Sequence, residues 1–357
     1  MSTADDSVLL RREGRVAHLV LNRPQAINAL THPMVRAIDA ALTAWAQDPG
    51  VETVVLTGAG ERGLCAGGDI RAIYQDARQG GDASRAFWRD EYRLNARIAR
   101  YPKPYVAIMD GIVMGGGVGV SAHGSSRVVT EHSRVAMPET GIGFAPDVGG
   151  THLLGLAPGE LGTHLALTGT PVSAGDALRC GLADHFVPRV ALPALLADLA
   201  RHPVRDALAR HVQPAPAGQL DAARAWIDAC YQAPTVEEII AELLAHGAPE
   251  AREAAETLLA RSPTALKVTL TAIRRARRLG SLEAVLDQEY RASCAALTSH
   301  DLVEGIRAQV IDKDRAPHWR PGTLAEVSDA HVARYFAPPG DQEPRLAADA
   351  PTVEVPW

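Results

Sequence analysis

Hydrophobic and polar positions change their period along the chain, from short apolar runs in the first half to helical spacing in the second. Residues 8–21 form two short alternating runs around a glycine-containing turn, which predicts a hairpin. The mostly apolar runs 51–58 and 101–111 predict buried strands. Apolar residues at helical spacing predict a helix after Thr31, a candidate N-cap, and another over 84–100. The first half is therefore expected to be mixed α/β.

Glycine-rich loops lie at 58–69, 111–124 and 140–150. The first two follow the apolar runs 51–58 and 101–111, the third follows two short strand-like runs after residue 126, and the first and third lead into predicted helices. This shared order of strand, loop and helix indicates a repeated local unit. From about residue 188 the chain becomes rich in Ala, Leu and Arg with helical periodicity, so the second half is expected to be helical. Pro214–Gly218 resembles a linker.

Composition and charge narrow the class of protein. The chain has 357 residues, of which 46% are hydrophobic and 22% charged, which is typical of a folded protein with a sizeable core. A net charge of −6 gives no electrostatic reason to expect a nucleic-acid or membrane partner. The four cysteines lie far apart with no metal-ligand spacing, and we find no signal peptide or membrane span. We therefore expect no metal site and a cytoplasmic location.

The segment Gly115–Gly119 is the main candidate for chemistry, because four of its five residues are glycine. Glycine lets backbone N–H groups approach a ligand closely, and a turn from strand to helix directs them at it. An oxyanion or a phosphate would be stabilised there. The competing structural interpretation is tight packing of a helix against a neighbour, which explains one or two glycines better than four.

A dinucleotide site is a second interpretation of the same loop. Gly117, Gly119 and Ala122 fit the glycine fingerprint, with Glu139 about twenty residues further on. Against it, the match lies deep in the chain, and Pro138 stands where a parallel strand should pair. A P-loop and a nucleophile elbow both fail for lack of their defining residues.

Glu139 and Asp147 lie in the third glycine-rich loop, in apolar surroundings. Partial burial would raise their pKa values and make one a base or nucleophile and the other a proton-carrying partner. Taken singly, an acid such as Asp147 is as often a turn residue. Asp69 follows two glycines and begins a helix, so we expect it to be an N-cap. The basic run 274–278 is expected to be a solvated helix face.

Three segments carry a resemblance to a known family. GLCAGGDIRAIY (63–74) resembles the first coenzyme A and oxyanion loop of the crotonase (enoyl-CoA hydratase/isomerase) superfamily, and residues 109–131 and 137–150 resemble its second half. The likeness covers roughly residues 8–200, and residues 262–319 resemble the family's C-terminal helices. It implies a crotonase-like spiral of repeated ββα units with a helical C-terminal region.

The resemblance implies roles for particular residues. Gly68 and Gly116 match the two backbone donors that polarise an acyl-CoA thioester carbonyl, and Ala66, Asp69 and Ile70 match substrate-binding positions. Of the two glutamates that hydratases use, the second matches Glu139 and the first is replaced by Gly119. Asp147 stands where hydratases have glycine, and Glu91 matches an acidic site residue of the 3-hydroxyisobutyryl-CoA hydrolase branch.

The branch implies hydrolysis of a short branched 3-hydroxyacyl-CoA, such as 3-hydroxyisobutyryl-CoA of valine catabolism, without a cofactor other than the CoA of the substrate. Gly141 and Ala145 stand where bulkier residues are common, so the shape of the acyl pocket stays open. Two alternatives remain: an enoyl-CoA hydratase or isomerase that uses Glu139 alone, and a non-catalytic acyl-CoA-binding scaffold. Family members commonly form trimers or paired trimers, so a homo-oligomer is expected.

The same comparison suggests a division of the chain. Residues 1–202 would form the core with the acyl-CoA site, and 203–335 a helical C-terminal region that includes an insertion at about 203–255. Residues 336–357 would form an extended tail.

Overall fold

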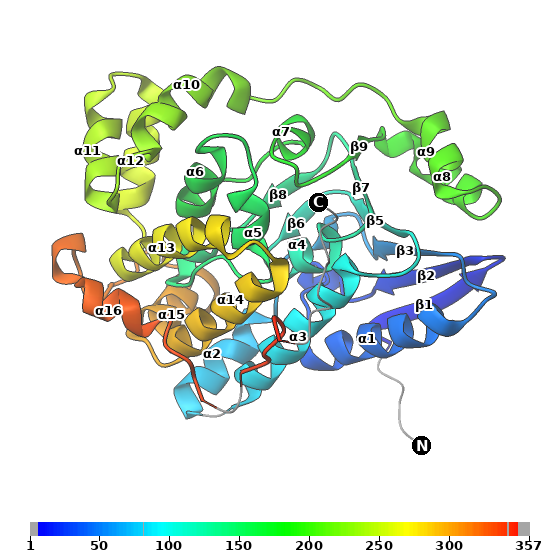
Figure 1. Ribbon diagram of the computed structural model, residues 1–357, viewed down its shortest axis with the longest axis horizontal. Coiled ribbons are helices and arrows are strands. Elements are labelled where there is room, and N and C mark those ends of the chain that lie inside the picture. The colour runs from blue at the N-terminus through cyan, green and yellow to red at the C-terminus, as the bar shows by residue number, and fades with distance from the viewer. Residues whose placement is uncertain (1–5, 81, 341–342, 349–357) are drawn as a thin grey trace, which may run out of the picture.

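Nine short strands form two sheets in the computed structural model, which describes residues 6–80, 82–340 and 343–348 (Figure 1). The larger sheet has the order β1-β2-β3-β5-β7-β9, and the smaller one the order β4-β6-β8. The strands are β1 (Val8–Glu13), β2 (Val16–Leu21), β3 (Thr53–Gly58), β4 (Gly63–Cys65), β5 (Tyr105–Met109), β6 (Ile112–Met114), β7 (Ser126–Val129), β8 (Arg134–Ala136) and β9 (His185–Phe186).

The predicted hairpin is confirmed, because β1 and β2 pair antiparallel, and every other pairing is parallel. The predicted buried strands are confirmed as β3 and β5. The strands β4 and β6 lie inside segments expected to be loops. Three residues are too few to show a period of two, which is why the sequence pattern did not reveal them.

Helices surround both sheets. They are α1 (His32–Gln47), α2 (Ile70–Gln79), α3 (Ala83–Ala99), α4 (Gly116–Ser121), α5 (Gly150–Gly155), α6 (Leu161–Thr168), α7 (Ala174–Arg179), α8 (Leu192–Leu199), α9 (Val204–His211), α10 (Leu220–Tyr231), α11 (Val236–Ala245), α12 (Pro249–Leu259), α13 (Pro263–Leu279), α14 (Leu282–Leu297), α15 (His300–Ile306) and α16 (Asp329–Arg334). Short 3-10 helices include η2 (Glu139–Ile142), and the π-helix η4 (Arg307–Ile311) follows α15.

The larger sheet is buried on both faces, because alternate residues of its parallel strands enter two different clusters. In β5, Tyr105, Ala107 and Met109 join the main core, whereas Val106 and Ile108 join a second cluster. Helices α8 and α9 supply the rest of the second cluster. Parallel strands that are covered on both faces have continuous apolar sequences, as this strand has.

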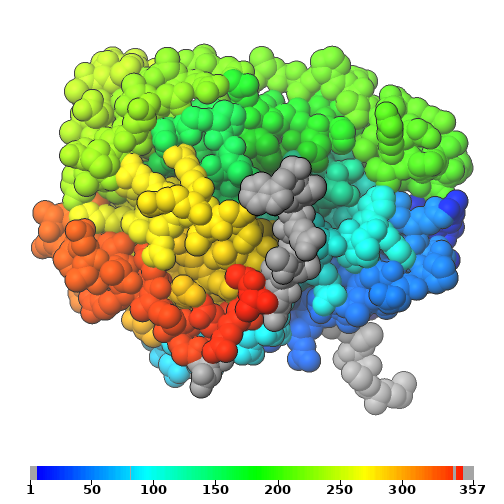
Figure 2. All heavy atoms as spheres, in the orientation of Figure 1, coloured from blue at the N-terminus to red at the C-terminus, as the bar shows by residue number. Residues whose placement is uncertain are grey.

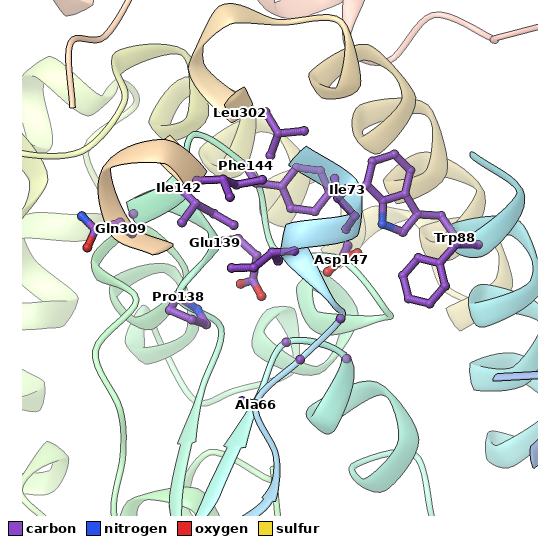
Figure 3. A pocket seen from close by; sticks show the side chains of 18 of the residues that line it. Ala66, Ile73, Trp88, Pro138, Glu139, Ile142, Phe144, Asp147, Leu302 and Gln309 are labelled. Atoms are coloured by element: carbon purple, nitrogen blue, oxygen red, sulfur yellow. The ribbon is translucent and has the colours of Figure 1, made fainter. Parts of the chain in front are cut away.

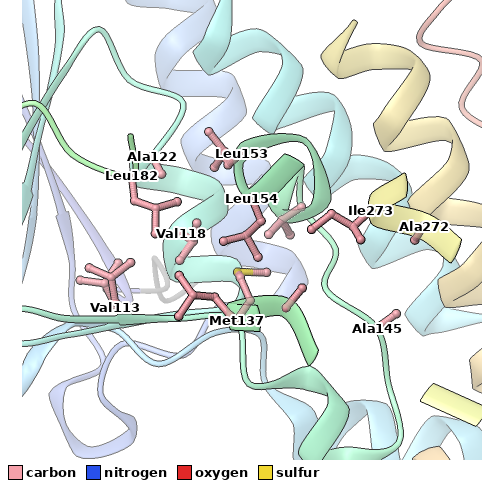
Figure 4. Close-up of a cluster of buried hydrophobic side chains, with 14 of the residues drawn as sticks. Val113, Val118, Ala122, Met137, Ala145, Leu153, Leu154, Leu182, Ala272 and Ile273 are labelled. Carbon is pink, nitrogen blue, oxygen red and sulfur yellow. The ribbon is translucent and has the colours of Figure 1, made fainter. Parts of the chain in front are cut away.

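The main core holds α5 against both neighbouring layers (Figure 4). Leu153 and Leu154 of α5 lie between Val118 of α4 and Ile273 of α13. Because the side chains from all three helices are buried, α5 and the loop before it have little room to shift.

The second half is helical, as predicted, and it divides into two groups. Helices α8 and α9 pack together on the larger sheet, whereas α10, α11 and α12 pack on α6 and α13 at the opposite end of the molecule (Figure 1). An extended segment that contains 214–218 joins the groups and lies beside Gly175 of α7. The expected boundary at 202/203 therefore falls between two packed helices, and the domain division stays a prediction.

The C-terminal helices form a continuous layer on the face shown in Figure 2, coloured yellow to red. Residues 343–348, the described part of the expected extended tail, form a turn on α14. The Asp287 carboxylate accepts hydrogen bonds from the backbone N–H groups of Leu346 (2.9 Å) and Ala347 (3.0 Å), which hold this turn in place. Residues 341–342 and 349–357 of the expected tail lie outside the described residues.

The basic run on α13 is only partly the solvated face that the sequence suggested, because Arg277 and Arg278 are exposed but three of its four arginines contact other segments. Arg274 donates to the carbonyl groups of Ala233 and Pro234, and Arg275 lies over the Phe336 ring. Arg277 pairs with Glu160 at 2.8 Å. These cations bind neighbouring helices and loops. No helix in the described part of the chain is long and apolar enough to cross a membrane.

Candidate active site

The three strands of the smaller sheet each lead into a segment expected to carry chemistry. Gly68 follows β4, Gly116 follows β6, and Glu139 follows β8, each within three residues of the strand end. Because all three strands are parallel, these segments meet at one edge of the sheet, the carboxyl edge, where parallel sheets commonly bind ligands. The sheet therefore brings together three residues that are far apart in sequence.

Gly68 and Gly116 present free backbone N–H groups at this edge. A bridge with Leu30 uses the carbonyl of Gly67 and the N–H of Asp69, which leaves the Gly68 N–H without a hydrogen-bond acceptor among the described residues. Gly116 begins α4, so its N–H has no partner within the helix. The position that a Cβ on Gly116 would occupy lies 3.3 Å from the Gly68 nitrogen, which shows that the two peptides are adjacent.

The glycines of the glycine-rich loop differ in their surroundings. A Cβ on Gly117 would collide with the Cys65 carbonyl, so this glycine lets α4 pack on β4. A Cβ on Gly119 would lie 2.7 Å from the Val148 Cβ and 2.9 Å from the Asn95 amide nitrogen. Gly115 and Gly116 line the cavity instead. Tight packing therefore accounts for two glycines of the segment, and the other two form part of the cavity wall.

A cavity of about 280 Å³ opens over these N–H groups (Figure 3). Its walls come from α2, α3, η2, α15 and η4 together with the loop that precedes α5. Apolar side chains form much of the lining, and the Trp88 and Phe144 rings stack with centroids 5.5 Å apart. The lining residues are Ala66, Gly67, Gly68, Ile70, Ile73, Phe87, Trp88, Glu91, Gly115, Gly116, Pro138, Glu139, Gly141, Ile142, Phe144, Asp147, Arg261, Leu302, Ile306 and Gln309.

Three buried carboxyl groups line this cavity. Glu91, Glu139 and Asp147 are 2%, 6% and 7% exposed. Glu91 Oε1 lies 2.8 Å from the position of a Cβ on Gly116, and Glu139 Oε1 lies 2.9 Å from that of a Cβ on Gly115. Glu91 Oε1 and Glu139 Oε2 have no hydrogen-bond partner within the described part of the chain. Both glutamates therefore lie beside the start of α4, and each has one oxygen without a partner among the described residues.

Burial raises the pKa of all three carboxyl groups, since it disfavours the charged form. The pKa values of Glu91 and Glu139 are raised well above the ordinary range, first by burial and then by the charge of Asp147. Burial raises the pKa of Asp147 to about 7, against a hydrogen bond from Tyr92 that lowers it. With pKa values raised in this way, the three groups do not all ionise together near neutral pH.

Tyr92 and Ser293 hold the Asp147 side chain. The Tyr92 hydroxyl donates to Asp147 Oδ2 at 2.8 Å and lies 2.8 Å from Ser293 Oγ. Both residues are buried. Sequence reasoning missed them, because Ser293 lies 201 residues from Tyr92 and no local motif connects them.

Seven of the eight site residues expected from the sequence line this one cavity: Ala66, Gly68, Ile70, Glu91, Gly116, Glu139 and Asp147. Asp69 does not. It occupies the N-cap position of α2, as expected, but its carboxylate pairs with Arg23 at 3.0 Å and makes no capping hydrogen bond to the helix. The Arg23 guanidinium offers this carboxylate a charged partner in place of the helix N–H groups.

No cluster of His, Cys, Asp and Glu in the described ranges is arranged to hold a metal ion. The four cysteines are buried and free, and burial raises the pKa of the Cys65 thiol to about 12, so this thiol is protonated at neutral pH.

Comparisons with known proteins agree on the family. A family model described as enoyl-CoA hydratase/isomerase matches residues 16–336. Over 356 residues the chain is 43% identical to a 3-hydroxyisobutyryl-CoA hydrolase of Danio rerio, covering 97% of this chain and 93% of the relative. It is 40% identical to the Homo sapiens protein of that name over 355 residues, covering 95% and 91%. Both relatives are named mitochondrial.

Solved structures that are similar to this chain are named as other enzymes than the hydrolases above. A carnitinyl-CoA dehydratase from Mycobacterium thermoresistibile is 58% identical with a TM-score of 0.92, and the match covers 94% of this chain and 98% of that one. An enoyl-CoA hydratase from Rhodobacter sphaeroides 2.4.1 is 45% identical with a TM-score of 0.89, at the same coverage.

Proposed function

The chain belongs to the enoyl-CoA hydratase/isomerase (crotonase) family, and we propose that within it this protein hydrolyses a short branched 3-hydroxyacyl-CoA thioester, with 3-hydroxyisobutyryl-CoA as the best candidate. The observation that carries the proposal is the position of Asp147 and Glu139 on one cavity, beside two free N–H groups. Two carboxyl groups that share protons can supply a base and an acid.

The thioester carbonyl oxygen would accept hydrogen bonds from the N–H groups of Gly68 and Gly116. These donors stabilise the negative charge that develops on this oxygen when the carbonyl carbon is attacked. A fixed donor of this kind commonly contributes a few kcal/mol to catalysis. Both donors belong to the backbone and need no rearrangement during the reaction.

Glu139 would supply the attacking oxygen, either as the nucleophile or as the base that takes a proton from water. The carbon–sulfur bond then breaks, and the departing CoA sulfur takes a proton from the carboxyl pair of Glu139 and Asp147. In the nucleophilic route water hydrolyses the resulting anhydride. A single turnover in ¹⁸O-labelled water tests for the anhydride. Label in Glu139 demonstrates the nucleophilic route, because direct attack of water on the thioester places label only in the acid product.

Glu91 would bind the hydroxyl group of the substrate or a water molecule, since its Oε1 is buried without a partner and lies over Gly116. A buried polar atom of this kind costs free energy until a ligand satisfies it. This group favours a 3-hydroxyacyl chain over a plain alkyl chain. The expected place of the protein in valine catabolism depends on that substrate.

Position 119 bears on the hydratase alternative. Val148 and Asn95 occupy the space that a side chain at Gly119 would enter, so no second glutamate reaches the cavity from this position. This arrangement favours hydrolysis, although similar solved structures are named as a hydratase and a dehydratase.

Release of free thiol from 3-hydroxyisobutyryl-CoA, measured beside hydration of crotonyl-CoA, tests the proposal. Thiol release without hydration supports it. Hydration without thiol release contradicts it in favour of the hydratase, and CoA binding without either reaction favours the scaffold. Glu139→Gln is expected to abolish thiol release and retain CoA binding. Glu131→Gln, at an exposed turn, is the matched control and should retain the full rate.

Two further expectations stay predictions. The curated relatives are named mitochondrial, so the cytoplasmic location needs a direct test by fractionation of the source cells. The expected trimer or hexamer is checked by the molar mass of the purified protein in solution.

A further inference from the structure

Asp147 precedes a sharply bent piece of backbone. Val148 has a φ of 53° and Gly149 a φ of 80°. A left-handed conformation is unusual for a β-branched residue, so the surrounding structure must hold Val148 in it. The Gly150 N–H donates to the Asp147 carbonyl at 2.6 Å and closes the turn, after which α5 begins. This bend sets the direction in which the Asp147 side chain leaves the backbone.

Contacts on two sides fix the bend. His123 donates from Nε2 to the Val148 carbonyl at 2.7 Å. The Val148 side chain is buried against the backbone of Gly119, where no Cβ intervenes. These contacts hold the Val148 carbonyl and side chain, but they leave the N–H groups that follow the bend without acceptors.

Glu289 of α14 accepts from those N–H groups. Its Oε2 accepts from the Gly149 N–H at 2.6 Å, and its Oε1 accepts from the Thr151 N–H at 2.9 Å and the Thr151 hydroxyl at 2.6 Å. The side chain is 2% exposed. The two oxygens of the Glu289 side chain thus satisfy donors on both sides of Gly150 at once.

The same helix reaches Asp147 a second time. Ser293 lies one turn after Glu289 and contacts the Tyr92 hydroxyl, which donates to Asp147. Thus α14 holds the backbone after Asp147 through Glu289 and the Asp147 carboxylate through Ser293 and Tyr92. Glu289 itself is not among the residues that line the cavity, so it has no direct access to a substrate.

We infer that Glu289 is a positioning residue for the proposed reaction, which keeps the bend at Val148 closed and the Asp147 carboxylate directed at the cavity. The inference rests on the proposed hydrolase function. It assigns to α14 a part in the reaction that no sequence motif indicates, because Glu289 and Gly149 are 140 residues apart.

Glu289→Gln is the first test, assayed by thiol release from 3-hydroxyisobutyryl-CoA. Glutamine has one acceptor oxygen, so its amide group must face an N–H group of Gly149 or Thr151. We expect kcat to fall between about tenfold and a hundredfold, with KM within about twofold and CoA binding unchanged, because displacement of Asp147 affects the chemical step.

Glu283→Gln is the matched control. Glu283 is a buried glutamate on the same helix, and it pairs with Arg100 at 2.5 Å away from the cavity. This variant loses the ion pair with the exposed Arg100 and should keep the wild-type kcat. If both variants have the same kcat, the positioning role is wrong and Glu289 serves stability alone.

Thr151 provides a milder test in case Glu289→Gln does not fold. Thr151→Val removes one of the three hydrogen bonds to Glu289 and should lower kcat by a fewfold. Thr151→Ser retains the hydroxyl group and should restore most of the rate. Equal kcat values for the two variants contradict the inference. A wild-type protein that releases no thiol contradicts the proposed function instead, so the two failures can be distinguished.

Discussion

Asp147 shows at the scale of a single residue how the cavity shapes chemistry. Its carboxyl group is buried beside Glu91 and Glu139 and accepts a hydrogen bond from Tyr92. Burial raises its pKa to about 7, so it can gain or lose a proton near neutral pH. The same burial lowers the free energy of unfolding when Asp147 is ionised, because its carboxylate is less well solvated here than in the unfolded chain.

We expect Asp147→Asn to stabilise the protein at alkaline pH. The folded-state pKa of Asp147 lies above its ordinary value of 3.8, so the folded protein binds the proton more tightly. This group therefore lowers the free energy of unfolding as pH rises from about 4 to about 7. The advantage of the variant should grow by about 1–3 kcal/mol between pH 5 and pH 8, as measured by urea denaturation. An advantage that shrinks over that interval would contradict the raised pKa.

Tyr92→Phe should move the pH dependence of kcat. The Tyr92 hydroxyl donates to the charged form of Asp147 and so lowers the pKa of that carboxyl. Without this hydroxyl, the midpoint of the kcat profile near pH 7 should move to higher pH, whichever protonation state of Asp147 the reaction needs. Tyr231→Phe is the control: its buried hydroxyl contacts His164 instead, so the midpoint should not move.

At the scale of elements, the smaller sheet determines where the reacting groups lie. The strands β4, β6 and β8 are three residues long, yet they place Gly68, Gly116 and Glu139 together at one edge. The positions and directions of the two glycine N–H groups depend on backbone geometry alone. Their spacing follows from the pairing of neighbouring strands, which stand about 4.8 Å apart in sheets.

Gly116→Ala should therefore lower activity severely. The added Cβ would lie 2.8 Å from Glu91 Oε1 and 3.3 Å from the Gly68 nitrogen, between the donors and the bound carbonyl. We expect kcat/KM for thiol release to fall by about a hundredfold to a thousandfold. Gly155→Ala in α5 is the control, because its Cβ would make an ordinary contact at 3.5 Å. It should retain activity and gain up to about 1 kcal/mol of stability.

How much of this could be predicted from sequence differs between elements. The hairpin and the long buried strands follow from their apolar patterns, whereas β4 and β6 are too short to show one. Glu139 and Asp147 could be singled out from their glycine-rich apolar loop, whereas Glu91 came from the resemblance to a family. The partners of Asp147 and of its loop, Ser293 and Glu289, could not be predicted because α14 meets the loop only after the whole chain has folded.

At the scale of the whole molecule, the larger sheet separates two packed layers. The cavity and the main core lie on one side, and α8 and α9 cover the other. No residue of the second cluster is among the described residues that line the cavity. Stability and activity should therefore respond separately to changes on the two sides.

Leu195→Ala tests this separation. Leu195 is fully buried in the second cluster on α8, so its truncation should cost about 2–5 kcal/mol of unfolding free energy. The kcat for thiol release should remain that of the wild type below the melting transition. Leu302→Ala makes the same change in size in the cavity wall and should alter KM for the acyl-CoA. A loss of kcat in Leu195→Ala would show that the two layers are coupled.

The short strands of the smaller sheet also bear on how this fold can diversify. They offer the N–H donors and the base through main-chain geometry, whereas much of the cavity wall is made of side chains on helices that arrive from elsewhere in the chain. Side chains of the cavity wall can be exchanged one at a time without moving the N–H donors. An insertion between β6 and α4, by contrast, would displace the Gly116 N–H. Proteins with this architecture can therefore change their specificity for the acyl group by single substitutions. The segments that follow each short strand must keep their length.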